Sequence, residues 1–145
     1  MSMPGSPPVI RVLIVDDDPD FSGALEKALM DAGGFTVRSV TEGLPALKLL
    51  DRDHGVIDVV VIDLNLPDVN GFEVIGAITR RKNVMGVLAT TGVYQETYLD
   101  IAKHLGANVA IRKPENRADL KSWAAAIRSI FRAENEIEFV SGAGE

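Results

Sequence analysis

Hydrophobic and polar positions follow two different periods along this chain, one typical of strands and the other of helices. Short runs rich in β-branched residues, such as Val59 to Ile62, end at turn-forming residues, and the longer segments between them repeat apolar positions at helical spacing. These periods predict strands over 10–15, 35–40, 57–62, 85–90 and 108–111, and helices over 20–32, 44–52, 72–81, 95–105 and from about 117 onward.

The regular alternation of strands and helices predicts an α/β fold with a parallel sheet and helices on both faces. The continuously apolar run from Val59 to Ile62 is typical of a central strand that is covered on both sides. Gly33, Gly34 and Gly106 directly follow predicted helices, where a left-handed residue favours glycine. We therefore expect a doubly wound, five-stranded parallel sheet.

The two ends of the chain differ from its body in composition. Residues 1–8 are rich in Pro, Gly and Ser and are expected to form a disordered leader before one folded domain over 9–132. The last predicted helix has an apolar stripe that includes Trp123 and is expected to pack on the sheet. Residues 133–145 are expected to be a C-terminal extension or linker, and the sequence leaves a frayed helix and a linker equally open.

Composition narrows the class of protein. A chain of 145 residues has room for one domain, which at this size buries roughly 68 to 70% of its unfolded surface. The net charge of -6 argues against direct binding to nucleic acid, and the absence of cysteine excludes disulfides and thiolate chemistry. No apolar run approaches the roughly 18 residues that a membrane span needs. We therefore expect a cytoplasmic protein with no membrane partner.

Polar side chains follow four of the predicted strands near the point where each strand ends. Asp16 and Asp17 follow the first strand, Asp63 the third, Thr91 the fourth and Lys113 the fifth. Because the carboxyl ends of parallel strands share one edge of a sheet, these residues are expected to converge on one pocket.

The acids in this set favour a cation site, although simpler explanations exist for Asp63 and for the neighbouring Asp18. Helix capping accounts for Asp18, but it does not require Asp16 and Asp17 as well, since like charges this close repel unless a cation compensates them. An Asx turn is the alternative explanation of Asp63. If Asp17 and Asp63 converge, they suit Mg²⁺, which prefers carboxylates, water and phosphate oxygens as ligands. The acids therefore indicate phosphoryl chemistry.

Lys113 and Thr91 extend this interpretation. An exposed lysine after a strand is common, but here Lys113 would be the cation that balances the carboxylates and binds a phosphoryl oxygen. The Thr91 hydroxyl would supply a further donor.

These residues together resemble the receiver domain of two-component response regulators, of the chemotaxis-regulator-like kind. The match consists of Asp16-Asp17, Asp63-Leu-Asn-Leu-Pro with Gly71 eight residues on, Thr91-Gly92 and Lys113-Pro114, in this order. It covers about residues 9–132. The resemblance implies the flavodoxin-like strand order 2-1-3-4-5.

The resemblance also implies a function. Asp63 would be the phosphoacceptor, taking a phosphoryl group from the phosphohistidine of a histidine kinase or a histidine phosphotransfer protein. Asp17, Asp63 and the backbone carbonyl of Asn65 would hold Mg²⁺ directly, with Asp16 acting through water. The chain would then be a signalling domain and not a turnover enzyme. Its further partners would be an output domain or partner protein, and a second copy in a phosphorylation-dependent dimer.

In this resemblance Thr91 and Lys113 would bind the phosphoryl oxygens, and the peptide bond before Pro114 would be cis. Thr91 rather than Thr90 is taken as the switch hydroxyl because a glycine directly follows it. One departure stands out, because Ala110 occupies the position three before the lysine where the family has an aromatic switch residue. The relay from the chemical site to a partner surface is therefore in question.

Two other classes are weighed against this one. Haloacid-dehalogenase-like phosphatases also use an aspartate nucleophile with Mg²⁺, but they need a second aspartate where this chain has Asn65, which cannot transfer protons. An interaction module with a receiver fold and no phosphorylation is the other alternative. The joint presence of the acids, the hydroxyl and the lysine argues against it.

Overall fold

The computed structural model describes residues 8–52, 57–81, 86–92 and 96–143, with side chains described as far as Glu134. Five strands form one parallel sheet in the order β2-β1-β3-β4-β5. The strands are β1 (Ile10–Val15), β2 (Phe35–Val40), β3 (Val59–Asp63), β4 (Gly86–Thr91) and β5 (Val109–Arg112). The helices are α1 (Pro19–Ala32), α2 (Gly43–Arg52), α3 (Gly71–Thr79), α4 (Glu96–His104), the short 3-10 helix η1 (Arg117–Leu120) and α5 (Lys121–Ala143). The predicted fold class is confirmed.

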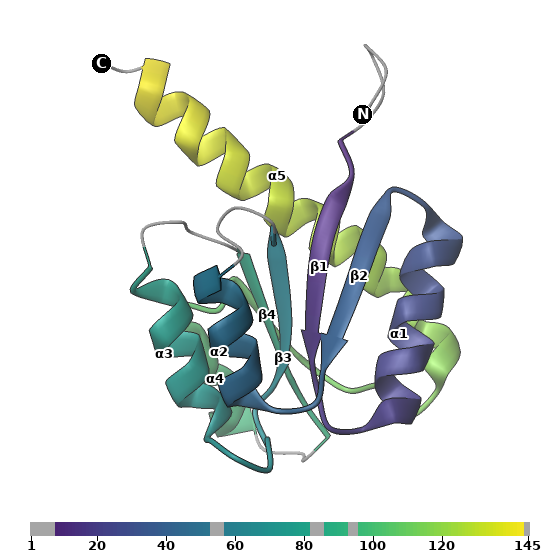
Figure 1. The fold of residues 1–145 in the computed structure, drawn as a ribbon. Coiled ribbons are helices and arrows are strands. Elements are labelled where there is room, and N and C mark those ends of the chain that lie inside the picture. The colour runs from purple at the N-terminus through teal and green to yellow at the C-terminus, as the bar shows by residue number, and fades with distance from the viewer. Residues whose placement is uncertain (1–7, 53–56, 82–85, 93–95, 144–145) are drawn as a thin grey trace.

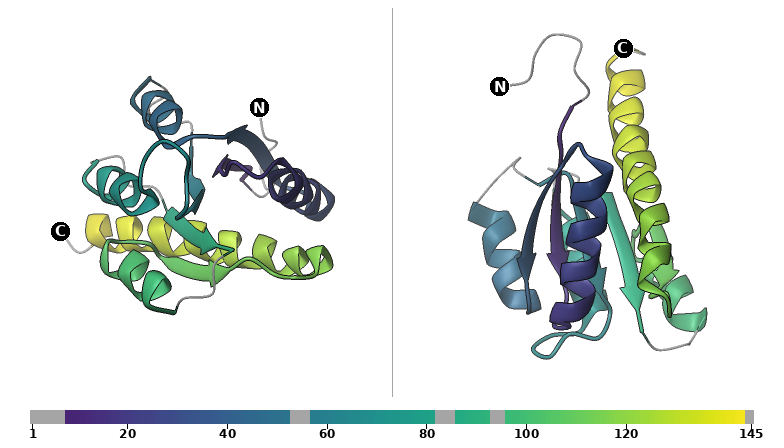
Figure 2. Two further views of the ribbon diagram at one scale, coloured as in Figure 1. Left: turned by 90° about the horizontal axis from the view of Figure 1, so that it is seen from below. Right: turned by 90° about the vertical axis from the view of Figure 1, so that its right-hand side faces the viewer.

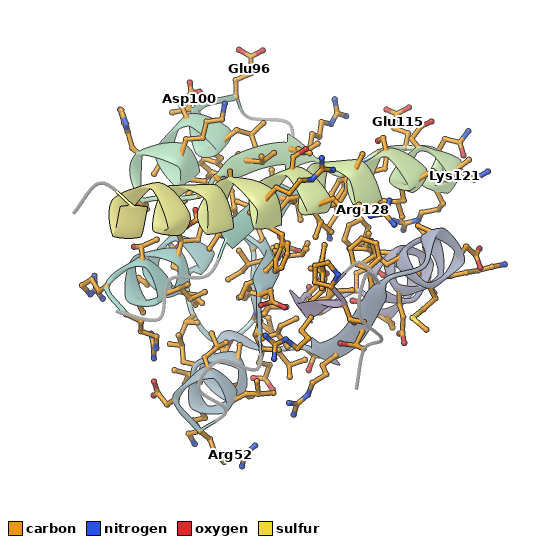
Figure 3. The ribbon with its side chains drawn as sticks, turned by 90° about the horizontal axis from the view of Figure 1, so that it is seen from above. Arg52, Glu96, Asp100, Glu115, Lys121 and Arg128 are labelled. Atoms are coloured by element: carbon orange, nitrogen blue, oxygen red, sulfur yellow. The ribbon has the colours of Figure 1, made fainter. Side chains whose placement is uncertain are left out.

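Helices cover both faces of the sheet (Figures 1 and 2). On one face, buried side chains of α2, α3 and α4 pack against alternate strand residues that include Val60 and Ile62. On the other face, α1 and α5 pack against the remaining strand residues, including Val59 and Val61. The labelled charged side chains of Arg52, Glu96, Asp100 and Lys121 point outward from the periphery (Figure 3).

The third strand begins two residues later than predicted. Its ladder with β1 starts at the pair Val12 and Val59. Asp58 instead accepts hydrogen bonds from the Arg11 side chain at 2.9 and 3.0 Å, and this contact ties the amino ends of the two strands together. The strand then runs on to include Asp63, so the predicted phosphoacceptor is held in the sheet itself.

The last helix extends beyond the end of the folded domain that the sequence predicts over residues 9–132. It continues to Ala143 and extends past the sheet (Figures 1 and 2). The division into a domain over 9–132 and an extension or linker over 133–145 stays a prediction, and all but the last residue of the expected leader 1–8 lies outside the described residues. No described helix combines the length and apolar character that a membrane crossing needs.

Gly71 allows α3 to begin directly against the end of β3. A Cβ atom at this position would lie 2.6 Å from the backbone oxygen of Asp63 and 2.6 Å from the Cα of Leu64. The Gly71 N–H donates to the Leu64 carbonyl at 3.1 Å, and Asn70 caps the helix. Because the neighbouring atoms are backbone, they have little freedom to move aside.

We predict that Gly71→Ala lowers the free energy of unfolding by about 1 to 3 kcal/mol, the usual cost of overpacking. Gly23→Ala is the matched control, because nothing lies within 4 Å of its Cβ position in the middle of α1. This control is expected to stabilise the chain by roughly 0.5 to 1 kcal/mol, since alanine favours helix over glycine. Urea unfolding of the three proteins measures both effects, and equal stability of Gly71→Ala and the unmodified chain would contradict the close approach.

Candidate functional site

The carboxyl ends of the strands bring the predicted residues together at one edge of the sheet. Figure 1 shows this edge at the lower end of the sheet, where the arrowheads of β1 and β2 point. Asp63 stands opposite Thr90 in the pairing of β3 with β4, and Thr91 stands opposite Arg112 in the pairing of β4 with β5. Lys113 follows at once, and its N–H donates to the Thr91 carbonyl at 2.9 Å. Residues separated by almost a hundred positions therefore share one site.

Three carboxylates make up the acidic part of this site. One ligand oxygen from each of Asp16, Asp17 and Asp63 lies within 4.8 Å of the others. Asp16 and Asp63 are buried, with exposed fractions of 2% and 4%, whereas Asp17 is exposed. A cavity of about 400 Å³ adjoins the cluster and is lined by Asp17 and by residues 64–70 of the loop after β3. Asp17 is therefore the acid of this cluster that lines the cavity, whereas Asp16 and Asp63 are buried beside it.

One oxygen of each buried acid accepts a hydrogen bond from a backbone N–H group. Asp16 Oδ1 accepts a hydrogen bond from the N–H of Asp18 at 2.8 Å, and Asp63 Oδ1 accepts one from the N–H of Asn65 at 2.9 Å. The Asx-turn explanation of Asp63 is thus correct for one of its oxygens. The second oxygen of each acid faces Lys113, so the turns orient both carboxylates toward the same cation.

Lys113 joins the two buried acids. Its ammonium nitrogen lies 2.8 Å from Asp16 Oδ2, as an ion pair, and donates a hydrogen bond to Asp63 Oδ2 at 3.1 Å. One ammonium against three carboxylates leaves two net negative charges in the cluster, because each group carries a single charge. This deficit matches a divalent cation, and the all-oxygen donor set suits Mg²⁺.

The expected cis peptide bond before Pro114 is wrong, because the described residues contain no cis peptide bond. A bond before proline prefers the trans form by roughly 0.5 to 1 kcal/mol. In this chain the trans form is compatible with both contacts of Lys113, the backbone bond to Thr91 and the ion pairs with the acids.

Burial changes the protonation behaviour of the site. Desolvation raises the pKa of Asp16 above its ordinary value of 3.8, against smaller opposing effects of Lys113 and of the Asp18 N–H. Desolvation on its own would lower the pKa of Lys113, but the contact with Asp16 and the charges of Asp63 and Asp16 outweigh it and raise that pKa. The contacts with the acids therefore favour the ammonium form of Lys113, whereas burial disfavours the charged form of Asp16.

Asn65 contributes a contact that the sequence analysis missed. Its side-chain amide donates a hydrogen bond to the Thr91 hydroxyl oxygen at 3.0 Å. The resemblance to receiver domains implies a role for Asn65 only through its backbone carbonyl, and that role stays a prediction. The signal in the sequence was an amide two residues after the acid, but the partner of such an amide depends on the fold of the loop. Thr91 is thus connected to the Asp63 loop, and its role as the switch hydroxyl stays a prediction.

The neighbouring Thr90 and Ala110 clarify what the site lacks. Thr90 is fully buried, and its hydroxyl has no hydrogen-bond partner among the described residues. Ala110 is half-buried in β5, stands opposite Ala89 of β4 and packs against the core on the side of α2, α3 and α4. The small side chain at this position leaves the site without the family's aromatic switch residue.

Comparison with known proteins identifies relatives over most of the chain. A family model described as the response regulator receiver domain matches residues 12–125. The response regulator SaeR of Staphylococcus aureus (strain USA300) is 31% identical over 110 residues, which are 76% of this chain and 46% of SaeR. The chain thus spans about half the length of the curated relatives it matches.

Solved structures agree with this similarity. The chemotaxis response regulator CheY4 of Vibrio cholerae superposes with a TM-score of 0.71 at 26% identity, covering 82% of this chain and 98% of CheY4. A CheY-like receiver domain protein from Methanospirillum hungatei superposes with a TM-score of 0.76 at 23% identity, covering 88% of this chain and 98% of that one. The second likeness supports the fold alone.

The raised pKa of Asp16 predicts a specific dependence of stability on pH. A raised pKa in the folded chain means that protonated Asp16 favours folding, so its contribution is present below the unfolded value near 3.8 and is lost as the pH rises through the folded value. In EDTA, the unmodified chain should therefore lose stability relative to Asp16→Asn as the pH rises from about 3.8 to neutrality. Urea unfolding at a series of pH values measures this difference, and a constant difference would contradict it.

The exposure of Asp17 leads to a prediction about the effect of Mg²⁺ on the stability of the chain. If Asp17 is a ligand, Mg²⁺ stabilises the unmodified chain, by about 2.7 kcal/mol at a concentration 100 times its dissociation constant. Asp17→Asn should lose most of this stabilisation and change little without the ion, because Asp17 is exposed. Asp20→Asn is the control, since Asp20 is also exposed and lies three residues on, in the first turn of α1. Thermal unfolding with and without Mg²⁺ measures this stabilisation. Equal stabilisation of the Asp17→Asn and Asp20→Asn variants by Mg²⁺ would exclude Asp17 as a ligand.

Proposed function

The chain belongs to the response regulator receiver domain family, and from that premise we propose that Asp63 accepts a phosphoryl group from a partner phosphohistidine. The observation that carries this proposal is the arrangement of Lys113, whose ammonium contacts Asp63 and Asp16 beside the exposed Asp17. A carboxylate that faces a fixed cation at the edge of a cavity is suited to nucleophilic attack on a charged group.

The transfer involves one bond made and one bond broken. A carboxylate oxygen of Asp63 attacks the phosphorus atom, and a new P–O bond produces an acyl phosphate. The bond between phosphorus and the partner's imidazole nitrogen breaks, its electron pair stays on that nitrogen, and the nitrogen then takes up a proton from solvent. The chain contributes position and charge rather than a proton, as is general for phosphoryl transfer.

Lys113 and Thr91 bind the transferred group in this proposal. Lys113 already lies 3.1 Å from Asp63 Oδ2, so its ammonium can neutralise charge on a phosphoryl oxygen attached to that carboxylate. Thr91 supplies an O–H donor, and the amide of Asn65 holds its oxygen near the Asp63 loop. Asn65 is neutral and hydrogen-bonded to Thr91, which also argues against the acid/base role that a phosphatase mechanism needs at this position.

The donor set fits magnesium. Asp17, Asp63 and the backbone carbonyl of Asn65 would hold the ion, and Asp16 would act through water. When bound, the ion supplies positive charge against the phosphoryl oxygens. The deficit of positive charge among the described acids, together with the exposure of Asp17 beside the cavity, supports this assignment.

The partner in this proposal is a histidine kinase or a histidine phosphotransfer protein in the cytoplasm. Phosphorylation would change the affinity of the chain for an output domain, a partner protein or a second copy. The relatives are longer than this chain, so the activity of a whole regulator is part of the proposal and not of the family assignment. The chain itself acts as a signalling domain.

Asp63 is predicted to take one phosphoryl group from acetyl phosphate in the presence of Mg²⁺, and mass spectrometry of the intact chain measures it. Asp63→Asn should take none. Asp68→Asn, in the same loop, should be labelled as the unmodified chain is, because Asp68 instead accepts hydrogen bonds from the N–H groups of Gly43 and Leu44. Absence of labelling in the unmodified chain, or equal labelling of Asp63→Asn, would overturn the proposed function.

A further inference from the structure

Lys113 has a third neighbour besides the two acids. Its ammonium nitrogen lies 4.6 Å from the centroid of the Phe21 ring, within the range of a cation–π interaction. Phe21 is fully buried, so the ring meets the ammonium in a region from which water is largely excluded. Since the side chain of Lys113 is itself only 13% exposed, the ring face and the two carboxylates surround it.

The start of α1 fixes the position of this ring. Asp18 caps the helix and accepts hydrogen bonds from the N–H of Asp20 at 3.0 Å and from the N–H of Phe21 itself at 3.4 Å. The cap therefore connects the ring directly to the segment that carries Asp16 and Asp17. These hydrogen bonds hold Phe21, in the first turn of α1, at a defined position relative to the acidic cluster.

The packing around the ring also comes from the other end of the chain. Phe21 makes an edge-to-face contact with Trp123 of α5, with centroids 5.5 Å apart and planes at 68°. The guanidinium carbon of Arg117 in η1 lies 5.4 Å from the Phe21 centroid. The ring is thus fixed between α1 and the α5 side of the molecule, and an immobile ring is the kind that can hold a cation.

We propose that Phe21 is a positioning residue for the phosphoryl-binding lysine, its ring face holding the Lys113 ammonium where it reaches Asp63. This proposal rests on the proposed function for its consequence, the rate of phosphorylation, but not for the contact itself. A lysine side chain is a flexible four-carbon stem, so its ammonium needs several contacts to be held in one place. The ring adds a third contact to those with the two carboxylates.

The same contact links the chemical site to α5. Any movement of the ammonium onto a phosphoryl oxygen changes its contact with a ring that touches Trp123. This route lies on the α1 and α5 side of the sheet, whereas Ala110 packs on the opposite side. Phe21 therefore lies between the site and α5, on the face of the sheet opposite to Ala110.

The test replaces Phe21 site-specifically by phenylalanines with increasing numbers of ring fluorines, which keep nearly the same shape but weaken the negative face of the ring. The rate of phosphorylation by acetyl phosphate at saturating Mg²⁺ should fall stepwise along the series, by about three- to tenfold in all. The same series at Phe72 is the matched control, because Phe72 makes an edge-to-face pair with Tyr98 on the other face of the sheet. Phe21→Leu, which keeps an apolar side chain without a ring, should be at least as slow as the most fluorinated variant.

A second readout does not depend on phosphorylation. The NMR order parameter of the Lys113 Cε methylene should fall along the Phe21 series and stay constant along the Phe72 series.

The outcomes separate the two proposals. If the unmodified chain takes up no phosphoryl group but the order parameter falls along the Phe21 series, the proposed function fails and the positioning of Lys113 stands. If the chain is phosphorylated but neither the rate nor the order parameter depends on the fluorination of Phe21, the role of Phe21 is overturned and the proposed function stands.

Discussion

The site depends on one interaction, the pairing of a single buried ammonium with two buried carboxylates. Removing a carboxylate from water costs several kcal/mol unless an opposite charge and hydrogen bonds compensate it. Lys113 compensates Asp16 and Asp63 in part, and the backbone N–H groups of Asp18 and Asn65 bind their remaining oxygens. Asp17 adds a further negative charge at the surface. The folded chain therefore holds an excess of negative charge at one edge of the sheet, which a divalent cation would offset.

The hydrophobic pattern was sufficient to predict the parallel sheet and to locate the acids, whereas the strand order followed from the resemblance to receiver domains. β-branched runs and helical periods depend on local chemistry, and the edge shared by parallel strands then brings Asp16, Asp63 and Lys113 together without knowledge of any side-chain contact. What the pattern did not show depends on tertiary structure. The amide of Asn65 reaches Thr91 because the loop after β3 folds back on itself, with a bridge between Asn65 and Asn70. The contact between the Arg11 side chain and Asp58, just before β3 begins at Val59, is likewise one that a period of two cannot reveal.

Phe21 illustrates the same limit. In the sequence it is one apolar residue of an amphipathic helix, and the ordinary interpretation is that it packs in the core. That interpretation is correct, since the ring is fully buried among the residues of α1 and α5. Its second property, the contact with Lys113, requires the helix to begin directly after the acids and the fifth strand to end beside it. The spacing of apolar residues predicts where the helix begins and where the strand ends, but not that the ring faces the ammonium.

The alternation of side chains along the strands divides the site between the two faces of the sheet. Val87 and Ala89 face α2, α3 and α4, and Thr91 continues this alternation at the end of β4. The ammonium of Lys113 instead meets Phe21, which belongs to the layer of α1 and α5. A group bound to Asp63 and contacted by both residues would therefore act on the two helical layers at once. The sheet separates those layers, and a group bound at its carboxyl edge, where Asp63 ends β3, would contact both.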